Sequence, residues 1–128
     1  MSTLINAMIH VVMAFLGDAT GAAKTATYTS TAFDAQDYEG NLGIVQASGV
    51  VSGTTPTLDG KIQDSADGST GWADVSGATF TQVTASTNFQ KITVDLNGTK
   101  RYLRYVGTIG GTTPSFGLTV IAGGVKKY

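Results

Sequence analysis

The stretch QDSADGSTGWADVSGATFTQV, residues 63–83, holds the residue types that most resemble a chemical site. Asp64, Asp67 and Asp74 lie within eleven residues, and Trp72, the only tryptophan of the chain, lies among them. Carboxylate oxygens are ligands for calcium, and an indole ring offers a flat face on which a sugar can stack. The stretch could therefore be a metal loop, a sugar-binding platform or the turn of a hairpin.

The spacing of the carboxylates favours the turn. An EF-hand loop needs oxygen ligands at alternate positions and a bidentate Glu at the twelfth, and no Glu follows here. Asp67-Gly68 is itself a turn former, because Asp tolerates the left-handed region and bonds its own backbone. A looser calcium site would use Asp59, Asp64, Asp67 and Asp74. We expect no metal or cofactor, and we expect Trp72 to anchor a small core or an interface.

No other constellation points to catalysis. The sole histidine, His10, lies in an apolar run, and the chain has no cysteine. No serine lies in a GxSxG elbow, and no phosphate-binding glycine loop is present. The glycine-rich residues 107–114 lack a following helix and lysine, so they predict a turn. We therefore expect that the chain is not an enzyme.

Charge is distributed unevenly along the chain. Residues 1–90 hold two basic residues against eight acids, and residues 91–128 hold six basic residues against one acid. Such a chain can pair its own halves or dock on a charged partner. A nucleic-acid-binding domain is normally basic overall, with aromatics between the bases. We expect no nucleic-acid partner, since only a short cluster has that character: Lys100, Arg101, Tyr102, Arg104 and Tyr105.

The N-terminal run LINAMIHVVMAFLG, residues 4–17, is too short to span a bilayer and has no basic residue before it. Its periodicity fits a short helix, with Thr3 as cap and Gly17 as stop, and also fits a strand. Residues 1–24 are expected to form an arm that needs a cover. The expected protein contacts are Leu4, Ile5, Met8, Ile9, Val12, Phe15 and Leu16, together with Trp72.

Residues 25–128 predict one β-sandwich domain. Thr, Ser and Gly supply 46 of the 128 residues, and charged residues supply only 13%, a composition typical of strands and turns. We expect SGTTP (52–56) and GGTTP (110–114) to end strands. Asn97-Gly98, between alternating runs, predicts a type I′ hairpin. The spacing of these signals predicts an all-β, jelly-roll-like antiparallel sandwich of about seven to eight strands.

The order of motifs in residues 57–128 resembles the small capsid cement, or decoration, proteins of tailed bacteriophages. The motifs are IQDS (62–65), DGSTGW (67–72), VDLNGTKRYLR (94–104) and GTTPSF (111–116). The N-terminal third resembles that family only as a short apolar start before a Thr-rich strand.

The resemblance implies a jelly-roll protein of the virion that is made in the bacterial cytoplasm. It would bind the outside of an icosahedral capsid and stabilise contacts between major capsid subunits, as a homodimer or homotrimer and without a cofactor or membrane. Deletion of residues 1–16 is then expected to weaken assembly. The alternative left open is a carbohydrate-binding sandwich module of a phage tail or fibre, which would need Trp72 exposed in a groove.

Overall fold

The computed structural model of the protein describes residues 11–14, 21–85 and 87–126. These residues form eight strands and one 3₁₀ turn: β1 (Val11–Ala14), β2 (Ala23–Lys24), β3 (Tyr28–Thr29), β4 (Phe33–Asp34), β5 (Tyr38–Ser65), β6 (Ala73–Thr79), β7 (Asn88–Asp95), η1 (Leu96–Gly98) and β8 (Tyr102–Lys126). All strand pairs are antiparallel. The predicted all-β antiparallel architecture is confirmed.

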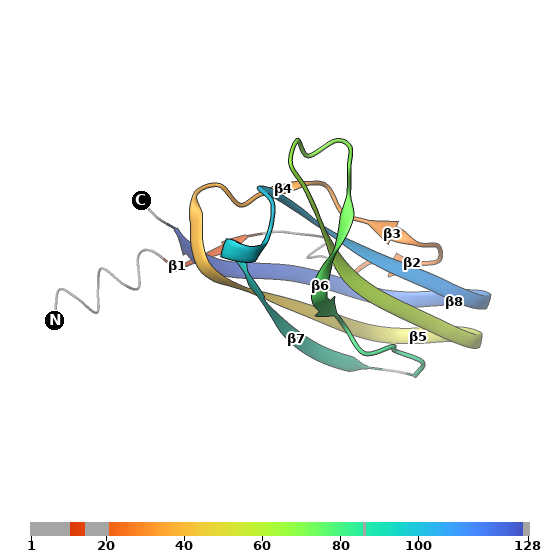
Figure 1. Cartoon of the computed structure of the whole chain (residues 1–128). Helices are drawn as coiled ribbons and strands as arrows, with labels where there is room; N and C mark the ends of the chain where they lie inside the picture. Colours follow the sequence, from red (N-terminus) through yellow and green to blue (C-terminus); the bar gives the residue numbers. More distant parts are fainter. Residues whose placement is uncertain (1–10, 15–20, 86, 127–128) are drawn as a thin grey trace, which may run out of the picture.

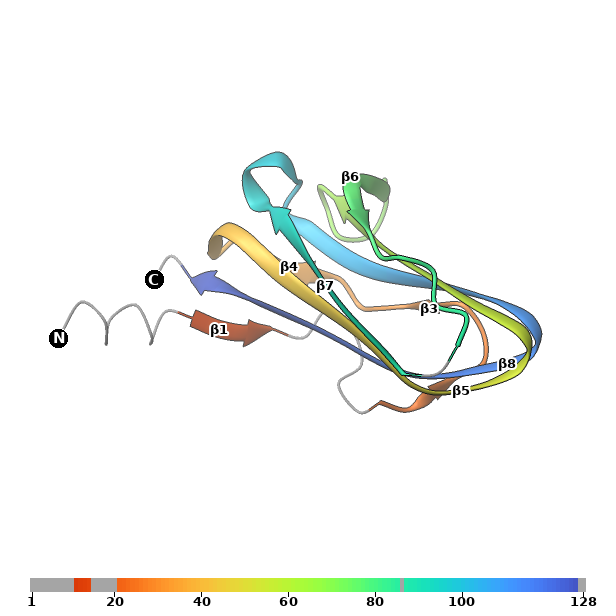
Figure 2. The same ribbon diagram turned by 90° about the horizontal axis from the view of Figure 1, so that it is seen from below.

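Two very long strands, β5 and β8, make the frame of the molecule. β5 has 28 residues and β8 has 25, and they pair from Tyr38↔Lys126 to Ser65↔Tyr102. The resulting ribbon folds back on itself, so that its first and second halves lie in two layers (Figures 1 and 2). Both ends of the ribbon therefore meet at one end of the molecule, which we call the open end, and the bend forms the closed end.

The bend is made by one tetrapeptide used twice. Gly-Thr-Thr-Pro occurs at 53–56 in β5 and at 111–114 in β8, and Thr54 pairs with Thr112 across the ribbon. The two glycines have φ of 108° and 109°, and the third residue of each copy has φ of 46°. The expectation that these segments end strands is wrong, because the positive φ values turn both strands together while the ladder continues.

Short strands complete the two layers. β7 pairs with the first half of β5, while β1 and β2 pair with the second half of β8. β6 pairs with the second half of β5, while β3 and β4 pair with the first half of β8. We call the first group the front layer and the second the back layer.

The predicted hairpin at Asn97-Gly98 is wrong. β7 pairs with β5 rather than with β8, and residues 96–101 carry the chain from the front layer to the back layer. The Asp95 carboxylate accepts a hydrogen bond from the Asn97 amide at 3.0 Å and starts a 3₁₀ turn. Gly98 is not among the residues with positive φ, so the type I′ geometry is not formed.

The core lies between the two layers. Alternate residues of the front layer, among them Leu42, Ile44, Leu118 and Val120, face alternate residues of the back layer such as Leu58, Ile62 and Leu103. Side chains of this size contribute about 1.5–3 kcal/mol each when fully buried. A core of this kind explains how the chain folds without disulfides.

The expected N-terminal arm, residues 1–24, lies partly outside the described residues. Within it, Val11–Ala14 is a strand that pairs with residues 122–125, and Ala23–Lys24 is a second short strand on β8. Leu4, Ile5, Met8, Ile9, His10, Phe15 and Leu16 lie outside the described residues. Among the described residues, no helix has the length and apolar character needed to cross a membrane.

Candidate functional site

The aspartate-rich stretch forms a turn between β5 and β6, as expected from Asp67-Gly68. The Asp67 carboxylate accepts hydrogen bonds from the backbone amides of Ser69 and Thr70 at 2.9 and 2.8 Å, and from the Thr70 hydroxyl at 2.8 Å. These donors, the backbone amides of Thr70 and Ser69 foremost, hold the pKa of Asp67 well below its usual range. Gly68 has φ of 76° and lies against the Tyr102 ring, where a Cβ would come within 3.0 Å. The carboxylate therefore serves the fold of the turn.

The four aspartates of a conceivable calcium site each have a separate structural partner. Asp59 accepts from the Gln82 amide at 3.1 Å, and the buried Asp64 accepts from the Lys100 backbone amide at 3.0 Å. The described residues contain no group of three His, Cys, Asp or Glu side chains that could hold a metal ion. Since Asp67 caps its own turn, the arrangement offers no shared cage of oxygen ligands.

Asp74, the fourth aspartate of the conceivable calcium site, belongs to a chain of polar contacts on the outer face of the back layer. Its carboxylate accepts from the Gln63 amide at 2.8 Å and pairs with the Lys61 ammonium at 3.0 Å. The Gln63 and Lys61 hydrogen bonds lower the pKa of Asp74. Arg104 donates to Gln63 at 2.9 Å and places its guanidinium 4.3 Å from the centre of the Trp72 ring. The polar groups of this face are thus paired among themselves.

Trp72 is half-buried on its own sheet beneath Arg104. Of the contact residues predicted in the N-terminal run, only Val12 lies among the described residues. It belongs to β1 and pairs with Gly124 of β8. Trp72 and Val12 lie in different layers of the sandwich, since β1 flanks the front layer and Trp72 directly precedes β6. The structure does not bring these two predicted contact residues together in one site.

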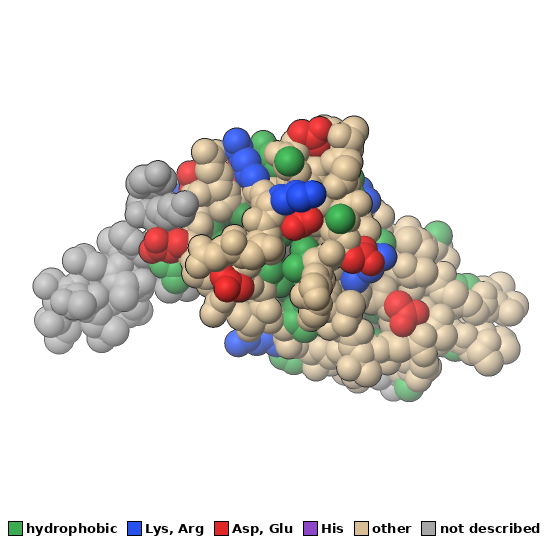
Figure 3. Space-filling model, viewed as in Figure 1, with side chains coloured by type: hydrophobic (Ala, Val, Ile, Leu, Met, Phe, Trp, Pro, Cys, Tyr) green, Lys and Arg blue, Asp and Glu red, His purple; other side chains and the backbone are tan. Residues whose placement is uncertain are grey.

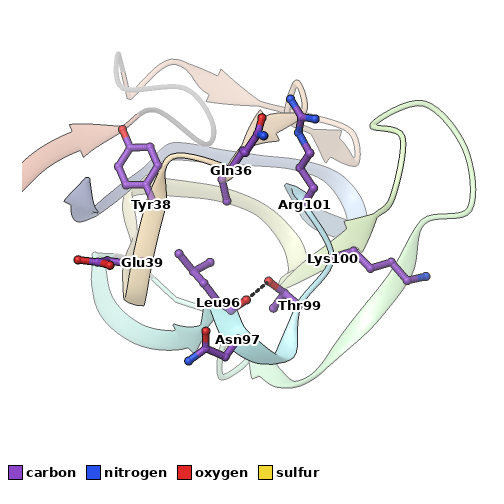
Figure 4. Close-up of a pocket in the computed structure, with 9 residues that line it drawn as sticks. Gln36, Tyr38, Glu39, Leu96, Asn97, Thr99, Lys100 and Arg101 are labelled. Atoms are coloured by element: carbon purple, nitrogen blue, oxygen red, sulfur yellow. Dashed lines mark hydrogen bonds between the residues drawn. The ribbon is translucent and has the colours of Figure 1, made fainter. Parts of the chain in front are cut away.

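A groove of about 280 Å³ lies at the open end, between residues 35–39 and residues 96–101. In the close-up, the charged ends of Glu39, Lys100 and Arg101 point outward, away from one another (Figure 4). Arg101 holds Asp34 with two hydrogen bonds, of 3.0 and 2.7 Å, and that partner lowers the pKa of Asp34. The groove therefore lacks a converging set of acid, base or nucleophile.

A buried polar pair, which the sequence did not indicate, links the two layers. The Tyr105 hydroxyl donates to the side-chain oxygen of Gln46, and both residues are fully buried. Gly60 makes room for the pair, because a Cβ there would lie 2.0 Å from that oxygen. Burial raises the pKa of Tyr105 far above its usual value, and the Gln46 amide nitrogen has no partner among the described residues. The pair is enclosed in the core and joins the two layers.

The outer face of the front layer carries few charged side chains. Gly43, Val45, Ala47 and Gly49 of β5 alternate with buried residues and point outward, and so do Gly117, Thr119, Ile121 and Gly123 of β8. β7 adds Phe89, Lys91 and Thr93 to this face, and its last residue, Asp95, adds an acidic side chain at the open-end margin. We call this surface the flat face.

Two large apolar side chains project from this region. Val50 is 81% exposed and Phe89 is 72% exposed. Beside them lies a groove of about 380 Å³ lined by Gly21, Ala23, Ala47, Ser48, Gly49, Val50, Ser115, Gly117 and Thr119. The sequence did contain a signal that Phe89 points outward. Phe89, Lys91 and Thr93 alternate with Ile92 and Val94, which take the inward positions.

Comparison with known proteins adds no relative. No protein-family model matches the chain, and neither a curated protein nor a solved structure matches it.

Proposed function

We propose that the chain is a structural virion protein that binds the outer surface of an icosahedral phage capsid and stabilises contacts between neighbouring major capsid subunits. The motifs of residues 57–128 suggest this role through their resemblance to phage cement proteins. The single structural observation that supports it best is the distribution of charge. No charged residue occurs between Glu39 and Asp59, or between Arg104 and Lys126.

These two uncharged segments include the paired β5 and β8 strands of the front layer, the bend, and the adjoining part of β8 in the back layer. In the space-filling view, charged side chains gather toward the open end and the β5–β6 hairpin, while the outermost part of the closed end consists of uncharged atoms (Figure 3). An uncharged, rigid surface can lie against another protein without the cost of desolvating ions. Weak contacts of this kind are multiplied when many copies bind one shell.

The alternative of a carbohydrate-binding module has less support. A sugar platform needs an open aromatic face beside polar groups, and Trp72 carries the Arg104 guanidinium 4.3 Å from its ring centre. Trp72 lines neither of the two grooves described above. Asp64 is buried and directed to the Lys100 amide, so it is unavailable as a sugar ligand beside the ring.

Co-sedimentation with empty, expanded capsids of the encoding phage tests the proposal. The full chain is expected to pellet with the capsids in a saturable manner, at a fixed number of copies per shell. Removal of residues 1–10 is expected to weaken this binding. This shorter deletion keeps β1, whereas removal of residues 1–16 would also remove β1 and its pairing with β8. Circular dichroism of both proteins controls for folding. Absence of capsid-dependent sedimentation of the full chain would overturn the proposal.

A further inference from the structure

The flat face combines a projecting group and a depression that lie next to each other. Phe89 pairs directly with Ala47, and Ala47 in turn pairs with Thr119, so the three residues form one row across β7, β5 and β8. Ala47 and Thr119 line the groove, whereas Phe89 stands beside it with 72% of its surface exposed. A knob and a hole are therefore neighbours on one surface.

The depression has a clear structural cause. Between Ser48↔Leu118 and Val51↔Phe116, β5 has two residues, Gly49 and Val50, where β8 has only Gly117. This β-bulge turns Val50 outward to form the rim. Gly21, Gly49 and Gly117 contribute no side chain to the lining, which leaves the groove open.

We propose that the flat face is the interface between two copies of this chain, related by a two-fold axis, with Phe89 of each copy seated in the groove of the other. A two-fold interface uses the same patch on both partners, so the patch must carry both the knob and its hole. This patch carries both. Its described charges are Lys91 and, at the open-end margin, Asp95, so two copies can approach without like-charge repulsion over most of the face.

The size of the face places the proposed dimer at the small end of specific interfaces. Strands lie about 4.8 Å apart and rise about 3.3 Å per residue, so three strands over eight positions cover on the order of 400 Å² per copy. With Phe89 and Val50 projecting, the pair buries on the order of 1,000 Å² in total, the lower limit for specific interfaces. The expected dimer is therefore weak, with a dissociation constant in the micromolar range.

The inference deepens the homo-oligomer implied by the proposed function, because it selects a two-fold dimer and its surface. It does not depend on capsid binding, since its test uses the purified full chain alone. Sedimentation equilibrium from low micromolar to near-millimolar concentration is expected to show a monomer–dimer equilibrium. The dimer is expected to persist at high salt, because ion pairs do not hold it.

Matched variants locate the interface. Phe89→Asp in β7 is expected to weaken dimerisation at least tenfold. Thr79→Asp, on the other edge strand that pairs with β5 and opposite Lys61, is expected to leave dimerisation unchanged. Both positions are exposed, so both variants are expected to keep the circular dichroism spectrum of the parent.

A charge-swap experiment tests the seating of the knob. Ser115→Arg at the groove is expected to weaken dimerisation on its own, and an equimolar mixture of Phe89→Asp and Ser115→Arg is expected to recover heterodimer. In that mixture one contact joins the new carboxylate to the new guanidinium, and the other contact keeps Phe89 and Ser115. The proposal would be overturned if the wild-type chain stays monomeric or forms trimers. It would also be overturned if the Phe89→Asp variant dimerises as well as the wild-type chain does.

Discussion

The closed and open ends of the folded ribbon are held by different means. At the closed end, the two Gly-Thr-Thr-Pro segments face each other with nearly identical backbone angles, and none of their residues is charged. Each segment repeats the same local contact, in which the second threonine hydroxyl donates to the preceding carbonyl at 2.8 Å. Backbone conformation, supported by one local threonine hydrogen bond in each segment, therefore defines this corner.

Aspartate side chains organise the open end. Asp34, Asp67 and Asp95 each accept a hydrogen bond from the backbone amide two residues later, at 3.0, 2.9 and 3.0 Å. Asp64 accepts from the Lys100 amide, which belongs to the crossover between the layers. Connections that leave the ribbon ends have no strand partner for these amides, so carboxylates replace the missing carbonyls.

The difference has a functional consequence. The open end depends on ionised groups, so its stability responds to pH and to charge mutations. The closed end contains no acidic residue, and the flat face has Asp95 only at its open-end margin, so the closed end and most of the flat face present the same surface over a wide pH range. That constancy suits a protein whose proposed role is contact with a shell and with a second copy of itself.

Substitution Gly53→Ala at the closed end should have the largest effect. The glycine has φ of 108°, and a Cβ there would lie 2.6 Å from the Thr113 carbonyl oxygen. Backbone strain and the clash are expected to cost about 2–4 kcal/mol of the free energy of unfolding. Urea denaturation measures this loss.

Two further alanine variants make this a test of the closed end. Gly111→Ala should match Gly53→Ala, because its Cβ would meet the Thr55 carbonyl oxygen at the same 2.6 Å. Gly98→Ala at the open end should have almost no effect, because nothing lies within 4 Å of its Cβ and its φ is not positive. Equal losses at Gly98 and Gly53 would contradict the view that the closed end is set by its backbone.

The fold class followed from the sequence, but its central feature did not. Gly and Pro clusters predict turns, and SGTTP and GGTTP carry that signal. The two segments form one shared corner, and do not end their strands, because they pair with each other across the ribbon. Asn97-Gly98 likewise carries a strong hairpin signal, which the Asx turn at Asp95 and the pairing of β7 with β5 override.

The candidate site was predictable in one part only. Asp67-Gly68 predicted the turn, because both residues act locally. The flat face depends on which strands become neighbours, so no local pattern shows that Phe89 stands beside a groove made by Gly49 and Gly117. Gln46 was equally hidden, since a glutamine in an alternating strand becomes a core residue only when Tyr105 faces it from the other layer.

Asp64→Ala should have an intermediate effect, at the open end. The substitution removes the buried acceptor of the Lys100 amide and leaves that donor without its partner. Loss of such an acceptor costs about 1–3 kcal/mol. Amide hydrogen exchange is expected to accelerate at residues 96–101, whereas residues 52–57 and 110–115 keep their protection. Faster exchange at both ends would show that the two ends do not open separately.

Asp34→Asn should have the smallest effect. It removes the exposed ion pair with Arg101, of 2.7 Å, but keeps an oxygen that can accept from the Gln36 amide. Exposed pairs contribute about 0.2–1 kcal/mol. The Arg101 hydrogen bond lowers the folded-state pKa of Asp34 below its unfolded value, so the contribution is present above the unfolded pKa and is lost as pH falls through the folded pKa. Urea midpoints of parent and variant should therefore differ slightly at neutral pH and converge at about pH 2, well below the ordinary carboxyl pKa. A difference that persists in acid would assign the effect to packing of the Asp34 side chain instead of its charge.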